Sequence, residues 1–191
     1  MTKKDIGAIV KTAISLFLIC AVAAGLVALV NYVTADKIQA IAQAQANEAK
    51  SAVLTAAERF EDLTDTALPD GAAGYLGKNA ADETVGYVFT TSASGYGGKI
   101  EVMTGFSPEG TITGVAILSI EETPGLGMNA KRESFLQQFV DTDGELTVIK
   151  NAEPGQNEIQ ALTSATITSR AMVKAVNAAR DCYDRVTGKG E

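Results

Sequence analysis

A long uncharged segment near the N-terminus constrains this chain more than any other feature. Between Lys11 and Asp36 the sequence reads TAISLFLICAVAAGLVALVNYVTA, 24 residues without a charged side chain. As an α-helix this segment would be roughly 36 Å long, enough to cross a hydrocarbon core of about 30 Å. The alternative is a cleaved secretory signal, whose apolar region is only about 7–15 residues long. We therefore predict an uncleaved transmembrane helix over residues 12–35.

The charges that flank this segment predict its orientation. Lys3, Lys4 and Lys11 precede it, and Asp5 is the one acidic residue among them. Cytoplasmic flanks of membrane spans carry an excess of Lys and Arg. We therefore expect a single-pass protein of the inner (cytoplasmic) membrane. Residues 1–11 would form a cytoplasmic tail, and the main domain would lie outside the cytoplasm.

The rest of the chain is acidic. The tail contributes +2 to a net charge of −7, so the remaining residues carry −9. Such a surface does not attract nucleic acid, and an anionic membrane surface would repel it. The charge therefore indicates a protein or small-molecule partner, and no nucleic acid.

The chain has no histidine and two cysteines. Cys20 falls inside the predicted span and Cys182 lies near the C-terminus, so we expect no disulfide between them. The absence of histidine excludes Ser-His-Asp and Cys-His nucleophile systems, histidine-bearing zinc sites and histidine-ligated haem. The sequence therefore predicts no catalytic residue and no metal site, and redox chemistry here would need an organic cofactor.

Beyond the span, the sequence predicts a helical stalk over residues 36–60 and one domain over residues 61–191. Short stretches of alternating apolar residues, joined by turns such as Ser107-Pro108-Glu109-Gly110, are typical of hairpins. Strands are expected at residues 84–91, 99–106, 111–120 and 145–150, with a short one around 74–76, and helices at 129–140, capped by Asn129, and 169–186. Apolar residues at helical spacing mark the buried face of each helix: Phe135, Leu136 and Phe139 in the first, and Met172, Val173, Val176, Ala179 and Tyr183 in the second. This order favours an α+β fold with a mainly antiparallel sheet.

Five hydroxyl residues precede the last predicted helix, where one would be enough to cap it. They are Thr163, Ser164, Thr166, Thr168 and Ser169. One reading is an N-cap made by Thr166 or Thr168 within a solvated loop. The other is an anion site, because free N–H groups at a helix start bind phosphate and Arg170 and Lys174 follow closely. The residues alone leave both readings open.

The segment ALTSATITSRAMVKAVNAA resembles the flavinylation motif of the FMN-binding domain family. This family includes the G subunit of the Rnf electron-transport complex and the C subunit of the sodium-translocating NADH:quinone reductase. In the family a flavin transferase joins FMN through a phosphoester to the last Thr of the motif, and that position is Thr166 here. Ser164 stands where Gly is commonest, and Gln160 stands where the motif often has Asp.

A second segment, EETPGLG, resembles another signature of the same family. The resemblance implies that residues of both motifs bind the cofactor. They are Glu122, Thr123, Gly125, Leu126 and Gly127 in one, and Thr163, Ser164, Ala165, Thr166, Thr168 and Ser169 in the other. Pro124-Gly125 suits a type II turn. Tyr87 or Tyr96 offers an aromatic face to the flavin, although we expect a core position for both.

The resemblance also implies a function. The chain would be a membrane-anchored electron-transfer subunit that carries covalent FMN within an Rnf-type ferredoxin:NAD oxidoreductase complex that pumps Na⁺ or H⁺. Its partners would be the other membrane subunits of that complex and, for maturation, a flavin transferase. Two alternatives remain from the sequence: an anchored FMN carrier for a different extracytoplasmic reductase, and a non-redox module that binds an anion.

Overall fold

The structure, a computed structural model, describes residues 3–63, 68–150 and 152–189. Parts of the predicted tail, the loop after residue 61 and the loop after residue 150 thus lie outside the described residues. The chain divides into two compact units, Met1–Ala44 and Gln45–Glu191. The boundary falls inside the first helix, so each unit is described by itself.

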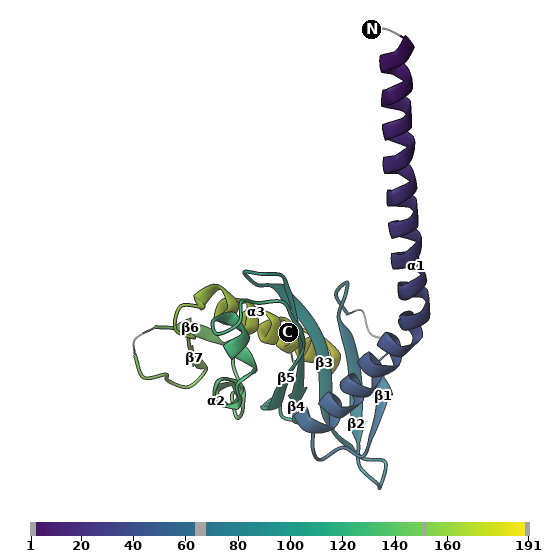
Figure 1. The fold of residues 1–191 in the computed structure, drawn as a ribbon. Helices are drawn as coiled ribbons and strands as arrows, with labels where there is room; N and C mark the ends of the chain where they lie inside the picture. The colour runs from purple at the N-terminus through teal and green to yellow at the C-terminus, as the bar shows by residue number, and fades with distance from the viewer. Residues whose placement is uncertain (1–2, 64–67, 151, 190–191) are drawn as a thin grey trace. The chain divides into compact units, whose positions relative to one another are not determined.

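The first unit contains most of one long helix, whose last residues belong to the second unit. Helix α1 comprises 51 residues, Lys3–Val53 (Figure 1). Its part from Ala13 onward contains a window of mean hydropathy 2.8 in which no residue is buried, and large side chains such as Phe17 and Leu26 are exposed. Exposed apolar side chains over this length are typical of a helix whose surroundings are lipid. Among the described residues this is the one helix long and apolar enough to cross a membrane.

The predicted stalk differs from the structure at its C-terminal end. Helix α1 ends at Val53, and Arg59–Asp62 already form strand β1. Val53 and Leu54 are buried in an apolar cluster with Val88 and Met103 of the main sheet. The last turn of the helix therefore belongs to the domain rather than to a solvated stalk, because its apolar residues pack on the sheet.

The second unit is built on a five-stranded antiparallel sheet with the strand order β1-β2-β3-β4-β5 (Figure 1). After β1 come β2 (Ala73–Lys78), β3 (Thr84–Ser94), β4 (Lys99–Phe106) and β5 (Ile112–Ile120). Each strand pairs with its neighbour in sequence, as consecutive hairpins do. The hairpins and the α+β class predicted from the sequence are confirmed.

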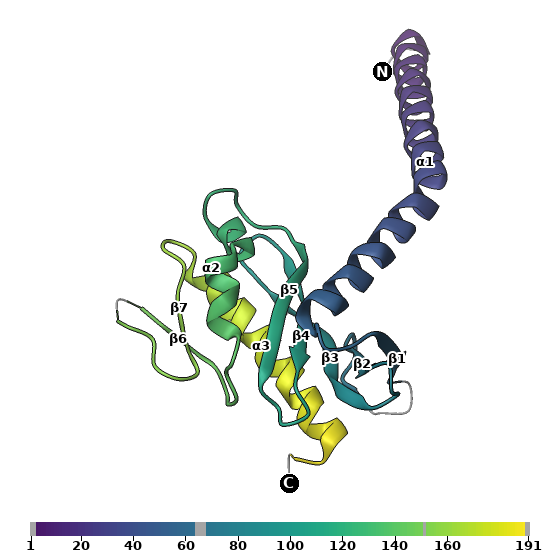
Figure 2. The ribbon, with the colours of Figure 1, turned by 90° about the horizontal axis from the view of Figure 1, so that it is seen from below.

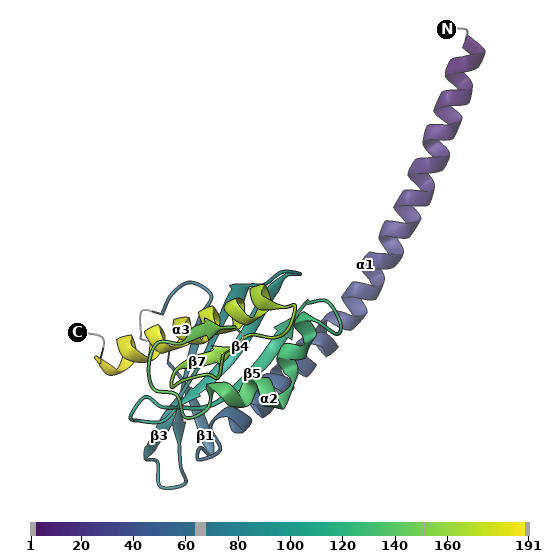
Figure 3. The ribbon, with the colours of Figure 1, turned by 90° about the vertical axis from the view of Figure 1, so that its left-hand side faces the viewer.

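Helix α3 (Thr166–Thr187) covers one face of this sheet (Figure 3). The main core lies between them and includes Phe89, Ile100 and Phe106 from the strands. The helix contributes the predicted apolar stripe, whose members are all buried: Met172, Val173, Val176, Ala179 and Tyr183. The stripe recurs every three to four residues, which is the period that keeps side chains on one face of a helix.

Four glycines on the other face accommodate the end of α1. Gly77 pairs with Gly86, and Gly105 pairs with Gly114, so that the four residues, here called the glycine row, lie on four adjacent strands. A Cβ at Gly77 would collide with the Leu54 side chain. A Cβ at Gly105 would collide with the carbonyl oxygen of Val53, and one at Gly114 would lie 2.8 Å from the Cα of Val53. The missing side chains allow the helix backbone to approach the sheet directly.

The helix predicted at residues 129–140 is three short turns instead. They are η1 (Gly127–Lys131), α2 (Glu133–Leu136) and η2 (Gln137–Phe139), the first and last being 3₁₀. Asn129 does not cap a helix; its side-chain Nδ2 donates to the carbonyl oxygen of Gly125 at 2.8 Å. Phe135 and Phe139 are buried as expected and contact each other edge to face. The tighter turns allow both rings to reach the core from a short segment.

Two short strands form a second sheet beside α2 (Figure 2). Strand β6 (Thr147–Ile149) was predicted, whereas β7 (Glu158–Gln160) was not, because three residues carry too little periodicity to identify a strand. The two strands are parallel.

Cys182 is free and buried on α3, as expected, and burial raises the pKa of its thiol.

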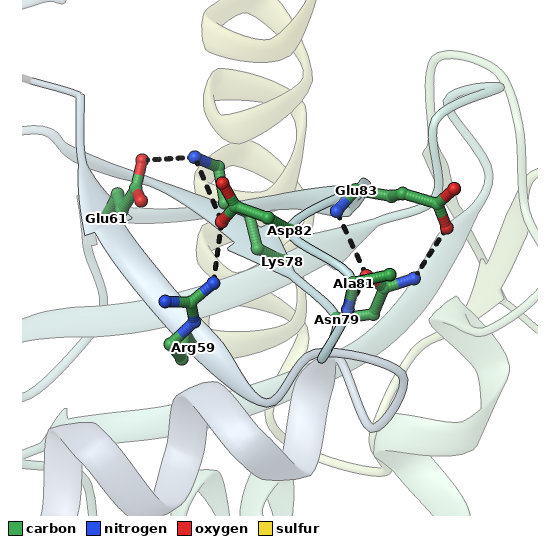
Figure 4. A network of polar contacts seen from close by, with 7 residues as sticks. All are labelled: Arg59, Glu61, Lys78, Asn79, Ala81, Asp82 and Glu83. Carbon is green, nitrogen blue, oxygen red and sulfur yellow. Dashed lines mark hydrogen bonds and ion pairs between the residues drawn. The ribbon is translucent and has the colours of Figure 1, made fainter.

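A network of charged side chains joins the first strands at the surface (Figure 4). Arg59 contacts Asp82 at 2.6 Å, and Lys78 contacts Glu61 at 2.8 Å and Asp82 at 3.7 Å. The hydrogen bond with Glu61 raises the pKa of Lys78. Exposed ion pairs contribute little to stability. The network therefore favours the pairing of β1 with β2 and does not carry the main stability of the sheet.

Candidate cofactor-binding site

A cavity of about 460 Å³ lies at the N-terminal end of α3. Three segments that are distant in sequence line it. The turn between β3 and β4 supplies Tyr96; the segment after β5 supplies Glu122, Thr123, Leu126 and Gly127; and the start of α3 supplies Ser164, Ala165, Thr166, Ile167 and Thr168. The structure therefore brings the two motifs of the sequence analysis to one cavity.

Three residues that the resemblance assigned to the site do not line this cavity. Ser169 is buried, and its hydroxyl accepts from the Leu162 N–H at 2.9 Å and donates to the Ala165 carbonyl at 3.0 Å. Gly125 has φ +77° in the turn closed by the Leu126 N–H and the Thr123 carbonyl, as a type II turn requires. Thr163 is exposed. Ser169 and Gly125 instead fix the backbone of the two motifs, Ser169 through its hydrogen bonds and Gly125 through its turn.

The first turn of α3 shows that neither predicted cap is made. Ala165 occupies the N-cap position and no side chain caps the helix, while Thr166 is already the first helical residue. The helix thus begins three residues earlier than predicted. Within the described residues, no acceptor is present for the N–H groups of Thr166, Ile167 and Thr168. Unpaired N–H groups at a helix start, with the positive end of the helix dipole, favour an anion.

Ser164 adopts a left-handed backbone conformation, with φ +61°, immediately before this helix. Glycine takes this conformation without strain, whereas a residue with a Cβ is disfavoured there. This is a physical reason for Gly to be the commonest residue at this motif position. The turn leaves Thr166 half-buried with its side chain on the cavity wall.

The two positive residues expected beside the hydroxyl cluster do not line the cavity. Arg170 and Lys174 line a different hollow, on the side of α3 that faces Glu145 and β6, together with Asn177 and Asp181. Arg170 follows Thr166 by about one helical turn, so it lies farther along α3 than the residues that line the cavity. Neither residue lines the cavity, and their contribution of charge beside the hydroxyl cluster stays a prediction.

Glu122 is the one charged residue among those that line the cavity. It is 8% exposed, and its Oε1 accepts a hydrogen bond from the Tyr96 backbone N–H at 2.7 Å. This contact fixes the turn Gly95–Gly98 against the segment after β5. The Gly95 N–H closes the same turn by donating to the Gly98 carbonyl at 2.7 Å.

Apolar side chains surround the cavity on its solvent side. Tyr96 is 74% exposed, Leu126 42% and Ile167 53%. In the described part of residues 45–189 they are the large apolar side chains that are exposed, and each comes from a different segment of the wall. Exposed apolar groups gathered in one place mark a surface that another molecule covers.

The two tyrosines considered from the sequence have different positions. Tyr87 contacts Tyr183 edge to face, with ring centroids 5.6 Å apart, and packs against the core as expected. The same expectation is wrong for Tyr96, because its turn projects beyond the sheet. Ile167 was missed altogether. The sequence contains a signal for each residue. Ile167 is a single apolar residue among hydroxyl residues, and Tyr96 is an aromatic residue between two glycines.

Comparison with known families identifies both parts of the chain. Residues 95–181 match the FMN-binding domain family, and this segment contains every residue that lines the cavity. Residues 1–53 match the RnfG N-terminal region, which coincides with α1.

Curated relatives match almost the full length. The G subunit of the Na⁺-translocating ferredoxin:NAD⁺ oxidoreductase complex of Acetobacterium woodii is 38% identical, covering 93% of this chain and 92% of the relative. The G subunit of the proton-translocating complex of Clostridium ljungdahlii is 33% identical over 97% of both chains. The fold is similar to that of the crystal structure of Shewanella oneidensis NqrC, with a TM-score of 0.50 at 18% identity over 63% of this chain and 64% of that one. The chain belongs to the family of G subunits of ion-translocating oxidoreductase complexes and contains its FMN-binding domain.

Proposed function

We propose that FMN is joined through a phosphoester to the hydroxyl of Thr166 and occupies the cavity. The observation that carries this proposal is the position of Thr166, on the cavity wall at the start of α3, among three N–H groups without an acceptor in the described residues. A phosphate on the Thr166 oxygen would lie where these N–H groups and the helix dipole stabilise negative charge.

The residues present fit the other parts of this cofactor. A tricyclic ring needs an apolar surface, and Tyr96, Leu126 and Ile167 supply one at the opening of the cavity. A ribityl chain needs polar partners, and Thr123, Ser164 and Thr168 line the wall with hydroxyl groups. The cavity volume of about 460 Å³ is within the usual range for small-molecule sites.

The bound FMN would supply the uptake and release of electrons. The chain would hold the phosphate, exclude water from part of the ring with its three apolar side chains, and leave the other part accessible at the opening. Covalent attachment would also prevent loss of the cofactor outside the cell. The role is thus that of an electron relay, which needs an electron donor and an electron acceptor from other subunits.

We infer that these partners are the other membrane subunits of an Rnf-type complex. The relatives in Acetobacterium woodii and Clostridium ljungdahlii are named as subunits of ferredoxin:NAD⁺ oxidoreductase complexes that translocate Na⁺ and protons, respectively. In this proposal α1 is a single-pass anchor whose lysine-rich N-terminus is cytoplasmic, and the flavin domain is extracytoplasmic. A flavin transferase would attach the cofactor.

Two other functions use the same cavity. An FMN carrier for a different reductase would have the same covalent flavin, and co-purification of the remaining Rnf subunits with this chain distinguishes it from the main proposal. A non-redox module would place a free anion at the unpaired N–H groups of α3. The apolar rim gives no reason for such a module, because a small anion does not cover it.

The test is the mass of the intact chain after production with an active flavin transferase. We expect a gain of one FMN less one water, and flavin fluorescence of the denatured band in a gel. Thr166→Ala should abolish both. Thr147→Ala is the matched control, because Thr147 is an exposed threonine outside both motifs and outside the cavity; it should retain full labelling. An unmodified wild-type chain, or labelling retained in Thr166→Ala, would contradict the attachment at Thr166.

A further inference from the structure

The cavity contains a buried carboxylate for which the protein supplies only one of the expected partners. Glu122 is 8% exposed and has no ion pair in the part of the chain that the structure describes. Taking a carboxylate out of water is unfavourable unless hydrogen bonds or opposite charges compensate it. A side chain in this position therefore calls for a reason beyond packing.

The two oxygens of Glu122 have different surroundings. Oε1 accepts from the Tyr96 N–H at 2.7 Å, whereas no described residue donates to Oε2. The missing side chain of Gly127 lets Oε2 lie close to the backbone: a Cβ on Gly127 would lie 2.6 Å from Oε2 and 2.7 Å from the Thr168 Oγ1. Gly95 likewise leaves room for Oε1. The two glycines thus make room for the carboxylate in the cavity wall, and its second oxygen has no donor among the described residues.

Anchoring the Tyr96 turn does not by itself require a charged group. A single acceptor is sufficient for one N–H, and a glutamine of the same shape would provide it. The negative charge and the second oxygen are left without a role in the protein alone. Both acquire one if the ligand in the cavity carries hydrogen-bond donors and changes its charge during turnover, as a flavin does.

We propose that Glu122 faces the isoalloxazine ring of the FMN and lowers its reduction potential. This inference rests on the proposed function. Reduction adds negative charge to the ring, and a carboxylate nearby in a partly water-excluded cavity opposes that charge more strongly than it would in water. Glu122 thereby has two functions, since one oxygen fixes the turn that carries Tyr96 and the charge of the carboxylate adjusts the cofactor.

The experiment is a redox titration, followed by flavin absorbance, of full-length protein that carries covalent flavin. Glu122→Gln retains the acceptor for the Tyr96 N–H and removes the charge. We expect it to raise the midpoint potential, so that at a fixed ambient potential the ratio of reduced to oxidised flavin increases at least tenfold, or about 30 mV for a two-electron couple. Glu121→Gln is the matched control, because Glu121 is the exposed neighbour outside the cavity; its potential should equal that of the wild type.

Other results would overturn this assignment without affecting the attachment at Thr166. An unchanged or lower potential in a fully flavinylated Glu122→Gln protein would do so, as would an equal increase in Glu121→Gln. If Glu122→Gln does not accept flavin, Glu122→Asp decides the question. If Glu122→Asp binds flavin with the wild-type midpoint potential, the site needs the carboxylate. If the flavin-free Glu122→Asp protein instead melts at a lower temperature than the flavin-free wild type, Glu122 serves only the fold. Absence of flavin from the wild type itself would refute the proposed function instead.

Discussion

At the scale of single residues, the site depends on backbone conformations as much as on side chains. Ser164 at φ +61° turns the chain into α3, and Gly125 at φ +77° makes the turn that presents Leu126. The first of these positions carries a Cβ where glycine would be unstrained. Ser164 therefore lowers the stability of the domain, although the turn has the conformation that glycine would adopt.

Replacing Ser164 by Gly should stabilise the domain. A residue with a Cβ is disfavoured in the left-handed region by roughly 1–2 kcal/mol, and the added freedom of glycine in the unfolded chain offsets part of this. We expect the free energy of unfolding to rise by roughly 0.5–1 kcal/mol, measured by urea denaturation. The control is Ser119→Gly in strand β5, where glycine should lower stability by a similar amount. A loss of stability in both variants would contradict the argument from φ.

At the scale of elements, the contact between α1 and the sheet combines packed side chains with a close approach of the helix backbone. The glycine row removes side chains from four strands at the place where Val53 and Leu54 lie. Thr113 adds a direct link, because its hydroxyl donates to the Val53 carbonyl at 2.5 Å. Carbonyl groups at a helix C-terminus need such partners. The position of the end of α1 therefore depends on the absence of side chains in the glycine row, and larger residues there would disrupt the contact.

Gly105→Ala should weaken this contact. The new Cβ would meet the carbonyl oxygen of Val53, a backbone atom that cannot move without the helix. Overpacking of this kind reduces the free energy of unfolding by about 1–3 kcal/mol, which thermal or urea unfolding of the domain would detect. Gly155→Ala serves as the control, since its Cβ would meet only the flexible Glu158 side chain at 3.2 Å. Equal stability of the two variants would show that the sheet yields to accommodate α1.

At the scale of the whole molecule, the folding unit begins inside α1. The compact unit starts at Gln45, whereas the sequence predicts a domain that starts at residue 61. The difference matters because Val53 and Leu54 are almost fully buried against the face of the sheet opposite α3. A chain cut at the predicted boundary would leave that face and the glycine row open to water.

Two shortened chains should therefore behave differently. A chain that starts at Gln45 should fold with the stability of the full domain. One that starts at Glu58 retains all five strands but lacks Val53 and Leu54, and burial of two such side chains contributes about 3–6 kcal/mol. We expect the second chain to unfold at much lower urea concentration, as followed by circular dichroism. Equal midpoints for the two chains would show that α1 adds nothing to the domain.

The sequence by itself determined the elements whose signal is local. The span follows from an uninterrupted apolar segment, strands such as Lys99–Phe106 from alternation, and the core face of α3 from its 3.6-residue period. These patterns are visible because each reflects burial of neighbouring residues along one element. The resemblance of two short motifs then predicted FMN as the cofactor and Thr166 as its attachment residue, but not the geometry of a site.

Only the tertiary structure decided which distant residues meet. It placed Tyr96 and Ile167 on the rim of the cavity, left Arg170 and Lys174 outside its lining, and left one oxygen of Glu122 without a donor among the described residues. It also drew the end of α1 onto the glycine row. Contacts of this kind depend on strand register, on turn geometry and on the rotation of a helix about its axis, and a shift of one residue in any of them redirects every side chain involved. That information lies in the packing of the whole domain rather than in any one stretch of its sequence.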